Sequence, residues 1–181
     1  MKLTKQQISQ HEAAKKILTK DSLTMDDKWF VYENYLPGYN NQIGKIASFF
    51  TPVGLAQEFF LHVGGKRLID LCAGIGVLSF VKYHFSHHKP EITCIERCQE
   101  FVDVGRKLLP EATWICGDVF DESLIKSLGT FDCVYANPPF GNIKSDKDCT
   151  WLGYTGSIAE YKVIAVGKHL SGNGTFIVPQ T

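Results

Sequence analysis

The chain of 181 residues carries 19 Lys and Arg against 19 Asp and Glu, so its formal net charge is zero, and 44% of its residues are hydrophobic. This length fits one domain with its own core, and the apolar stretches are too short for a membrane-spanning helix. Residues 1–20 lack the apolar block of a secretory signal. We therefore expect a cytoplasmic protein without a membrane span.

Two helices are expected before the main domain. Apolar residues fall near helical spacing in residues 4–20 and again in residues 26–36. Pro37, Gly38 and two Asn residues then form a turn-rich break. We therefore divide the chain into a helical N-terminal extension, residues 1–42, and a core, residues 43–181.

Strand and helix patterns alternate along the core. The expected strands are residues 67–72, 91–96, 112–117, 131–136 and 174–179, and the expected helices are residues 76–84, 97–109, 122–128 and 157–170. Ser157 and Glu160 have the spacing of a capping box at the start of the last helix. The alternation predicts an α/β fold with a mostly parallel sheet and helices on both faces.

Cysteine and histidine give no sign of a metal site. Cys94 and Cys98 are loosely spaced like ligands, but no second pair completes a tetrahedral set. Cysteines within strand-like runs are expected to pack in the core as small hydrophobic residues; these are Cys72, Cys94, Cys116 and Cys133. Histidines near the end of the first core helix are expected to be solvated; these are His84, His87 and His88. We predict no metal.

The first core strand runs into a turn of small residues, Asp-Leu-Cys-Ala-Gly-Ile-Gly from Asp70 to Gly76. Such residues let the backbone approach a ligand at the start of a helix, although an ordinary tight turn has the same composition. Glu96 ends the next strand about twenty residues later, where a ribose would need a hydrogen-bond acceptor. The alternative is that Glu96 is a solvated acid at the start of a helix. Asp118 follows the third strand. Because parallel strands end at one edge, we expect a ligand site there.

This series resembles the cofactor site of class I methyltransferases, which have a Rossmann-like fold and bind S-adenosylmethionine. The resemblance implies that Gly74 and Gly76 pass close to the methionine part of the cofactor. It also implies that Glu96 binds the ribose hydroxyls and that Asp118 accepts from the adenine amino group, with Val119 or Phe120 covering the adenine ring. The implied cofactor-binding residues are Phe50, Thr51, Asp70, Cys72, Ala73, Gly74, Gly76, Glu96, Asp118, Val119, Phe120 and Asn137.

Two features qualify this resemblance. Arg97 departs from the family pattern, because an apolar residue often follows the ribose-binding acid. A dinucleotide-binding domain is the rival interpretation, but the loop lacks the third glycine of that fingerprint.

The fourth strand delivers Asn137, Pro138, Pro139 and Phe140 at the same edge. A Pro-Pro turn ending a strand is the plain alternative. The tetrapeptide resembles the catalytic motif of amino methyltransferases, which modify adenine N6, cytosine N4 or protein glutamine. An exocyclic amine is a poor nucleophile, and acceptors at the Asn137 side-chain oxygen and the Pro138 carbonyl would make its lone pair available. The prolines restrict these acceptors before substrate arrives, and Phe140 offers a face for a base rotated out of the duplex.

A further match precedes the glycine loop. Ser-Phe-Phe-Thr-Pro at residues 48–52 is followed by apolar residues at helical spacing, with Thr51 as the expected N-cap and Pro52 in the first turn. This segment resembles one in adenine methyltransferases of restriction-modification systems, including type I modification subunits, in which the Thr helps to hold the methionine end of the cofactor. An ordinary capped amphipathic helix is the alternative.

The resemblance covers about residues 43–179 and implies an adenine-N6 methyltransferase of DNA. Alternatives are a methyltransferase of RNA adenine or protein glutamine, and a non-catalytic cofactor-binding regulatory or anti-restriction module. The family fold normally continues beyond a fifth strand, so we expect an incomplete core whose DNA contacts depend on a missing recognition domain or a partner subunit. The neutral charge agrees with this expectation. The loop of residues 141–156 carries Lys144, Lys147, Trp151 and Tyr154, which suit a nucleic-acid strand or a solvated loop equally.

Overall fold

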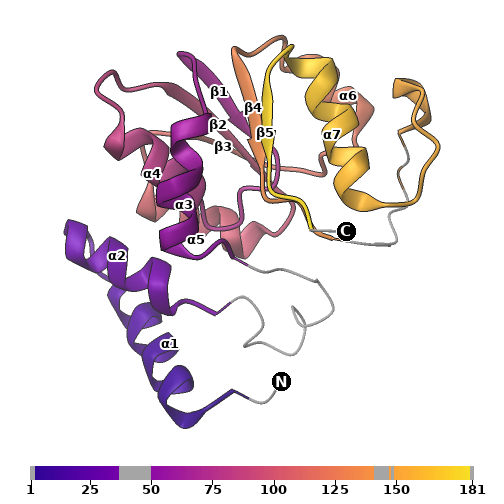
Figure 1. The fold of residues 1–181 in the computed structure, drawn as a ribbon. Helices are drawn as coiled ribbons and strands as arrows, with labels where there is room; N and C mark the ends of the chain where they lie inside the picture. Colours follow the sequence, from indigo (N-terminus) through magenta and orange to yellow (C-terminus); the bar gives the residue numbers. More distant parts are fainter. Residues whose placement is uncertain (1–2, 37–49, 141–146, 148, 180–181) are drawn as a thin grey trace.

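A computed structural model describes residues 3–36, 50–140, 147 and 149–179. The chain begins with two helices, α1 (Lys5–Ile17) and α2 (Met25–Asn34) (Figure 1). Thr4 and Thr24 are their N-caps, and each forms a capping box with the residue three positions later. None of the helices in these described ranges is long and apolar enough to cross a membrane.

The core is a five-stranded sheet in the order β3-β2-β1-β4-β5, and every pair of neighbours is parallel. The strands are β1 (Arg67–Asp70), β2 (Glu91–Glu96), β3 (Thr113–Cys116), β4 (Cys133–Ala136) and β5 (Gly174–Phe176). The predicted alternation is confirmed, although only β2 has the predicted bounds. The strand order reverses between β1 and β4, so the chain leaves these two strands in opposite directions.

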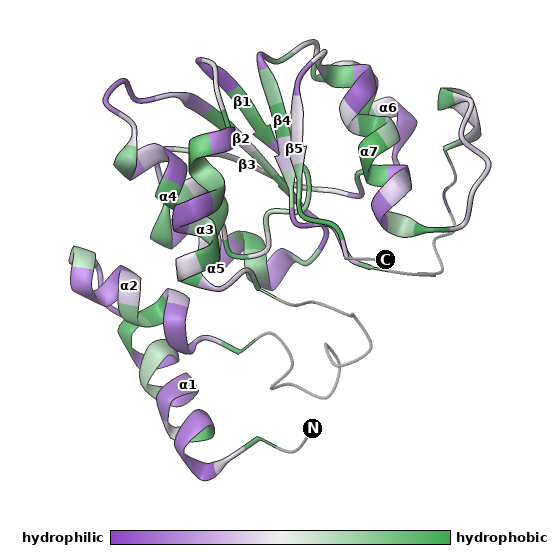
Figure 2. Cartoon of the chain, in the orientation of Figure 1, coloured by the Kyte–Doolittle hydropathy of each residue, from purple (hydrophilic) through white to green (hydrophobic). Residues whose placement is uncertain are grey.

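Helices cover both faces of the sheet, as predicted. One face carries α3 (Val53–Phe59), α4 (Val77–Phe85) and α5 (Gln99–Leu108); the other carries α6 (Glu122–Ser127) and α7 (Ala159–Leu170) (Figure 1). Short 3-10 turns, η1 (Phe60–His62) and η2 (Thr150–Leu152), complete the elements. Figure 2 shows the central strands β1 and β4 as hydrophobic, whereas the helices carry residues of both kinds. Each face of the sheet therefore has its own hydrophobic core.

The N-terminal helices share one of these cores. Trp29 and Tyr32 of α2 contact Phe80 of α4, with ring centroids 4.9 and 4.8 Å apart. Tyr35 donates a 2.6 Å hydrogen bond to Glu100 of α5, and the Leu36 N–H donates one of 3.0 Å to His11 Nδ1. The boundary at residue 42 stays a prediction, and it lies outside the described residues.

Two predicted caps are wrong. α3 has no side-chain cap, because its N-cap position is occupied by Pro52, whose side chain has no acceptor; the Thr51 hydroxyl accepts from Asn137 instead. α7 begins at Ala159 with Ile158 at the N-cap position, so Ser157 and Glu160 form no capping box.

The predicted burial of Cys116 and the predicted exposure of His84 are both wrong. Cys116 is exposed, because the last residue of edge strand β3 is not covered by a helix. His84 is half-buried rather than solvated, since its ring lies 4.3 Å from that of Phe80, and burial lowers its pKa. His87 and His88 are exposed, as predicted.

Candidate active site

The glycine loop follows β1 at the point where the strand order reverses, which is where open α/β sheets bind ligands. Gly74 has φ of 56° and Gly76 has φ of 90°, conformations that other residues rarely adopt. The Leu71 N–H donates to the Tyr135 carbonyl at 3.1 Å, and the Ala73 N–H donates to the Ile95 carbonyl at 3.0 Å. These bonds tie the loop to both neighbouring strands.

Phe50 packs directly against this loop. A Cβ added at Gly74 would lie 3.0 Å from Cδ1 of the Phe50 ring. On its other sides Phe50 meets Phe101 and Tyr35, with ring centroids 5.0 and 6.3 Å away. The close approach of Phe50 and the positive φ of residue 74 together favour glycine there, and the contact brings a residue predicted from the sequence to the loop.

Glu96, at the end of β2, is held by backbone amides. Its Oε2 accepts from the Gly74 N–H at 2.9 Å, and its Oε1 accepts from the Cys98 N–H at 2.7 Å. Burial raises the pKa of Glu96 even though these hydrogen bonds favour the ionised form. The carboxylate is thus fixed beside the glycine loop, and it is not a solvated acid.

Asp118 follows β3, and its carboxylate faces Arg97. Its Oδ1 accepts from the Phe120 N–H at 2.9 Å, and its Oδ2 lies 3.9 Å from Arg97 Nη1. Val119 and Phe120 are each 8% exposed and pack in the core beneath α6 and α7. Arg97, which departs from the family pattern, therefore places a cation beside the acid predicted to bind adenine.

Asp70 is completely buried at the start of the loop. Its Oδ2 accepts from the Ser79 hydroxyl at 2.9 Å, whereas its Oδ1 is buried without a hydrogen-bond partner among the described residues. Burial raises the pKa of Asp70 to about 7, and hydrogen bonding from the Ser79 hydroxyl and from the backbone amide of Cys72 opposes that rise. Sequence reasoning missed Ser79, because a serine on a buried helix face has no motif of its own.

Asn137 follows β4 on the other side of the reversal point. Its Nδ2 donates to the Thr51 hydroxyl at 3.0 Å, and its Oδ1 is buried without a partner among the described residues. Thr51 is itself 6% exposed. Two residues that are far apart in the sequence are thus brought together, and the contact turns the amide so that one acceptor remains available.

In the rest of the motif, the exposure of the side chains increases from one residue to the next. Pro138 is buried, Pro139 is half-buried, and Phe140 is 39% exposed. Phe140 therefore presents an aromatic face to solvent beside the buried amide of Asn137.

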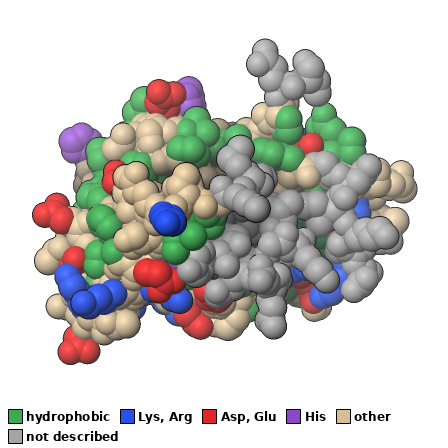
Figure 3. Space-filling view, turned by 90° about the horizontal axis from the view of Figure 1, so that it is seen from below, with side chains coloured by type: hydrophobic (Ala, Val, Ile, Leu, Met, Phe, Trp, Pro, Cys, Tyr) green, Lys and Arg blue, Asp and Glu red, His purple; other side chains and the backbone are tan. Residues whose placement is uncertain are grey.

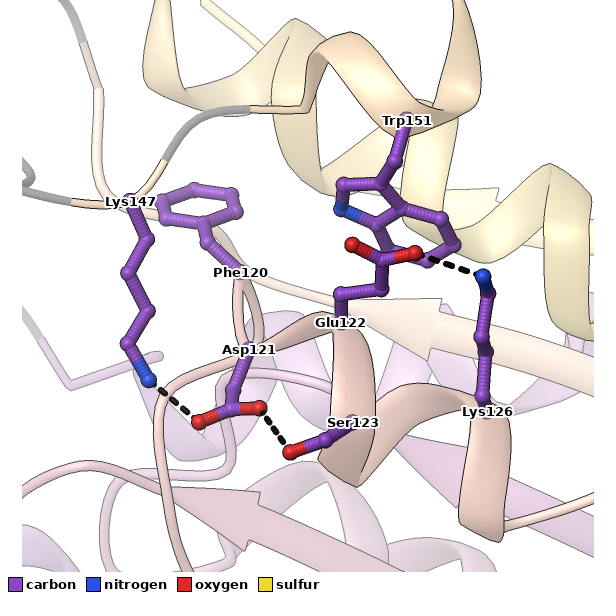
Figure 4. A pocket seen from close by; sticks show the side chains of 7 residues that line it. All are labelled: Phe120, Asp121, Glu122, Ser123, Lys126, Lys147 and Trp151. Carbon is purple, nitrogen blue, oxygen red and sulfur yellow. Dashed lines mark hydrogen bonds and ion pairs between the residues drawn. The ribbon is translucent and has the colours of Figure 1, made fainter.

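A pocket of about 520 Å³ lies between α6 and the segment after the motif (Figure 4). Its walls are the rings of Phe120 and Trp151 and two ion pairs, Lys147 with Asp121 and Lys126 with Glu122. The Lys126 ammonium also lies 5.5 Å from the Trp151 ring centroid. The Trp151 indole N–H is buried without a hydrogen-bond partner in the described part of the chain. Lys144, predicted with this loop, lies outside the described residues.

The polar groups gathered at this edge suit S-adenosylmethionine. Asp70, Glu96, Asp118 and Asn137 all present acceptor oxygens, and two of those oxygens are buried without hydrogen-bond partners in the described part of the chain. The cofactor carries the complementary donors, an ammonium, two ribose hydroxyls and an adenine amine, together with a cationic sulfonium. Buried acceptors without partners are costly, and such a ligand would satisfy them. Among residues 3–36, 50–140, 147 and 149–179, no cluster of His, Cys, Asp and Glu could hold a metal.

The fold is the Rossmann-like fold of class I methyltransferases. Residues 55–154 match the family described as the methyltransferase small domain. The chain therefore belongs to this family. No curated protein matches the chain.

Solved structures share the fold. A protein from Listeria monocytogenes, assigned as a class I S-adenosylmethionine-dependent methyltransferase, superposes with a TM-score of 0.61 over 94% of this chain at 13% identity. The type I restriction-modification methyltransferase subunit from Streptococcus thermophilus gives 0.57 over 90% at 18% identity. A modification subunit assigned to a type I restriction enzyme from Vibrio vulnificus gives 0.60 over 82% at 12% identity. The chain spans 65%, 41% and 36% of their respective lengths.

Proposed function

We propose that this protein methylates the N6 amine of adenine in DNA. The observation that carries the proposal is the buried Oδ1 of Asn137, which has no hydrogen-bond partner among the described residues, while Thr51 engages the amide nitrogen. An acceptor held in this way before substrate binds can take one hydrogen of an exocyclic amine. Preorganised acceptors of this kind lower the barrier most where charge develops, as it does on the attacking nitrogen.

The other residues of the motif would complete this chemistry. The Pro138 carbonyl takes the second amine hydrogen, and the two prolines restrict the backbone that carries it. Phe140, which is exposed, stacks on a base rotated out of the helix. S-adenosylmethionine supplies an electrophilic methyl group when bound. With the amine lone pair freed by two acceptors, no strong general base is required.

We further propose the cofactor contacts that the sequence predicts. Phe50, Thr51 and the loop from Asp70 to Gly76 would hold the methionine end. Glu96 would bind the ribose hydroxyls, and Asp118 would accept from the adenine amine, with Arg97 beside it. The buried Oδ1 of Asp70 supports this arrangement, because a buried carboxylate oxygen requires a donor such as the cofactor ammonium.

Nucleic acid as the substrate is supported by the pocket beside α6. Phe120 and Trp151 line it with aromatic rings, and Lys126 and Lys147, each paired with an acidic side chain, lie beside them (Figure 4). Aromatic faces with neighbouring cations suit a single nucleic-acid strand. Two of the solved structures with this fold are type I modification proteins, which favours DNA over RNA or protein.

A recognition domain or partner subunit would supply most phosphate contacts. Figure 3 shows the face to which the strands point, and on its described part Lys and Arg side chains are mixed with Asp and Glu. The net charge of the chain is zero. A polyanion is held by an excess of cations, and this surface offers little excess.

The experiment is methyl transfer from labelled S-adenosylmethionine to duplex DNA, single-stranded DNA, RNA and total protein, followed by digestion and mass spectrometry. We expect N6-methyldeoxyadenosine. Asn137→Ala is the control, because it removes the acceptor and leaves the glycine loop intact. Label only in RNA or in glutamine would refute the DNA proposal, and cofactor binding without transfer to any acceptor would favour a regulatory module.

A further inference from the structure

Three buried polar side chains lie side by side at the end of the central strands. In the parallel register Asp70 of β1 is paired with Cys94 of β2 and with Tyr135 of β4. Ser79 of α4 contacts all three of them. Each of these four residues is 0% exposed. The hydrophobic core therefore contains a compact polar cluster, which we call the Ser79 cluster (Asp70, Ser79, Cys94 and Tyr135).

Hydrogen bonding within the Ser79 cluster has a defined direction. The Ser79 hydroxyl donates to Asp70 Oδ2 at 2.9 Å, and a hydroxyl has only one hydrogen to donate. The Tyr135 hydroxyl, 2.8 Å away, and the Cys94 thiol, 3.3 Å away, must then donate to the Ser79 oxygen. With Asp70 ionised, Ser79 uses its hydrogen and both of its lone pairs. Ser79 therefore joins strands β1, β2 and β4 to helix α4.

The Ser79 cluster lies directly beneath the edge that binds the ligand. Asp70 is the first residue of the glycine loop. Glu96 follows Cys94 by two residues, and Asn137 follows Tyr135 by two residues. Residues two apart on a strand face the same side, so the orientation of each cluster side chain influences that of the ligand residue after it. Loosening one bond of the cluster should therefore disturb the loop and Asn137 together.

We propose that Ser79 and Tyr135 are positioning residues, which hold the Asp70 carboxylate and the ends of β1, β2 and β4 in the arrangement that binds the cofactor. This proposal rests on the cofactor contacts proposed above. Neither residue touches the cofactor; each acts through Asp70. Ser79 engages Asp70 Oδ2 and thereby fixes the plane of the carboxylate, whereas Oδ1 is buried without a hydrogen-bond partner among the described residues and would accept from the cofactor.

The test compares Tyr135→Phe and Ser79→Ala with the wild-type chain by titration calorimetry with S-adenosylmethionine. We expect Tyr135→Phe, which loses one hydrogen bond behind the site, to bind about tenfold more weakly. Ser79→Ala loses the bonds to Asp70, Tyr135 and Cys94 and should bind at least as weakly. Hydrogen–deuterium exchange provides an independent readout. In both variants the amides of residues 71–76 should exchange faster without cofactor, whereas those of α7 should not change.

The pH dependence of binding separates positioning from a general loss of stability. The titratable groups around Asp70 are Cys72 and Glu96 near the loop, Cys94 on β2 and Tyr135 on β4. Removing a donor that favours the ionised carboxylate should raise the pKa of Asp70. The pH at which cofactor affinity reaches half of its maximum should therefore move upward in Ser79→Ala, which lacks this donor, and should stay near the wild-type value in Tyr135→Phe, in which Ser79 still donates to Asp70.

Tyr32→Phe is the matched control. Tyr32 is 6% exposed, and its hydroxyl is buried without a hydrogen-bond partner in the described part of the chain. We expect wild-type affinity, exchange and pH dependence in this variant. Wild-type behaviour of Tyr135→Phe and Ser79→Ala, or an equal loss in Tyr32→Phe, would overturn the proposal. If the wild-type chain itself bound no cofactor, the proposed contacts would be wrong instead.

Discussion

Asp70→Asn should make the fold less sensitive to alkaline pH. Asp70 is completely buried, and burial raises its pKa from 3.8 to about 7. A carboxyl whose pKa is raised in the folded state stabilises the fold while it is protonated, and this contribution is lost as pH rises through the folded pKa. Between pH 5 and pH 8 the wild-type chain should therefore lose about 3 kcal/mol through this one group, at about 1.4 kcal/mol for each pH unit below 7.

The asparagine variant carries no proton to lose in this range. At pH 5 it should be less stable than the wild type by about 1 to 3 kcal/mol, because its amide nitrogen takes the place of the unpartnered oxygen. At pH 8 it should be at least as stable as the wild type. The measurement is urea unfolding, followed by circular dichroism at several pH values without cofactor.

Asp132→Asn serves as the control. Two backbone amides, those of Arg67 and Lys66, lower the pKa of Asp132, so its contribution is lost only in acid. The difference between this variant and the wild type should stay constant from pH 5 to pH 8. If the curves of Asp70→Asn and the wild type are parallel over this range, Asp70 is ionised throughout and the reasoning fails.

Three further predictions concern the site. Asn137→Ala should lower the rate of methyl transfer by about a hundredfold or more and should lower cofactor affinity much less. A near-normal rate in single-turnover kinetics would show that the amine mechanism is wrong. Glu96→Ala and Asp118→Ala should each weaken cofactor binding by about 1 to 3 kcal/mol, and unchanged affinity in both would remove the proposed ribose and adenine contacts. The 181-residue chain should bind duplex DNA weakly and with little sequence preference, and its affinity should fall steeply as the salt concentration rises. Tight, salt-resistant and sequence-selective binding in fluorescence assays would refute this prediction.

Periodicity and local motifs were enough to predict the order of the elements. The alternation of strands and helices, the glycine loop and the acids at the strand ends follow from residue types that act within a few positions of each other. For that reason β2 was predicted with its observed bounds, and the class of cofactor followed from motif order. The roles proposed for Asn137, Glu96 and Asp118 remain predictions.

Contacts between distant segments were decided only by the tertiary structure. Thr51 suits an N-cap by type, but Pro52 occupies the N-cap position of α3, and the Thr51 hydroxyl instead accepts from Asn137, 86 residues away. Ser79 and Tyr135 belong to no motif, and they matter because the sheet register sets Tyr135 beside Asp70 while α4 lies over both. The sequence by itself determined which groups reach the carboxyl edge of the sheet. Which of their oxygens remain free there was decided by packing, because a hydrogen-bond partner is chosen by distance in space and not by distance along the chain.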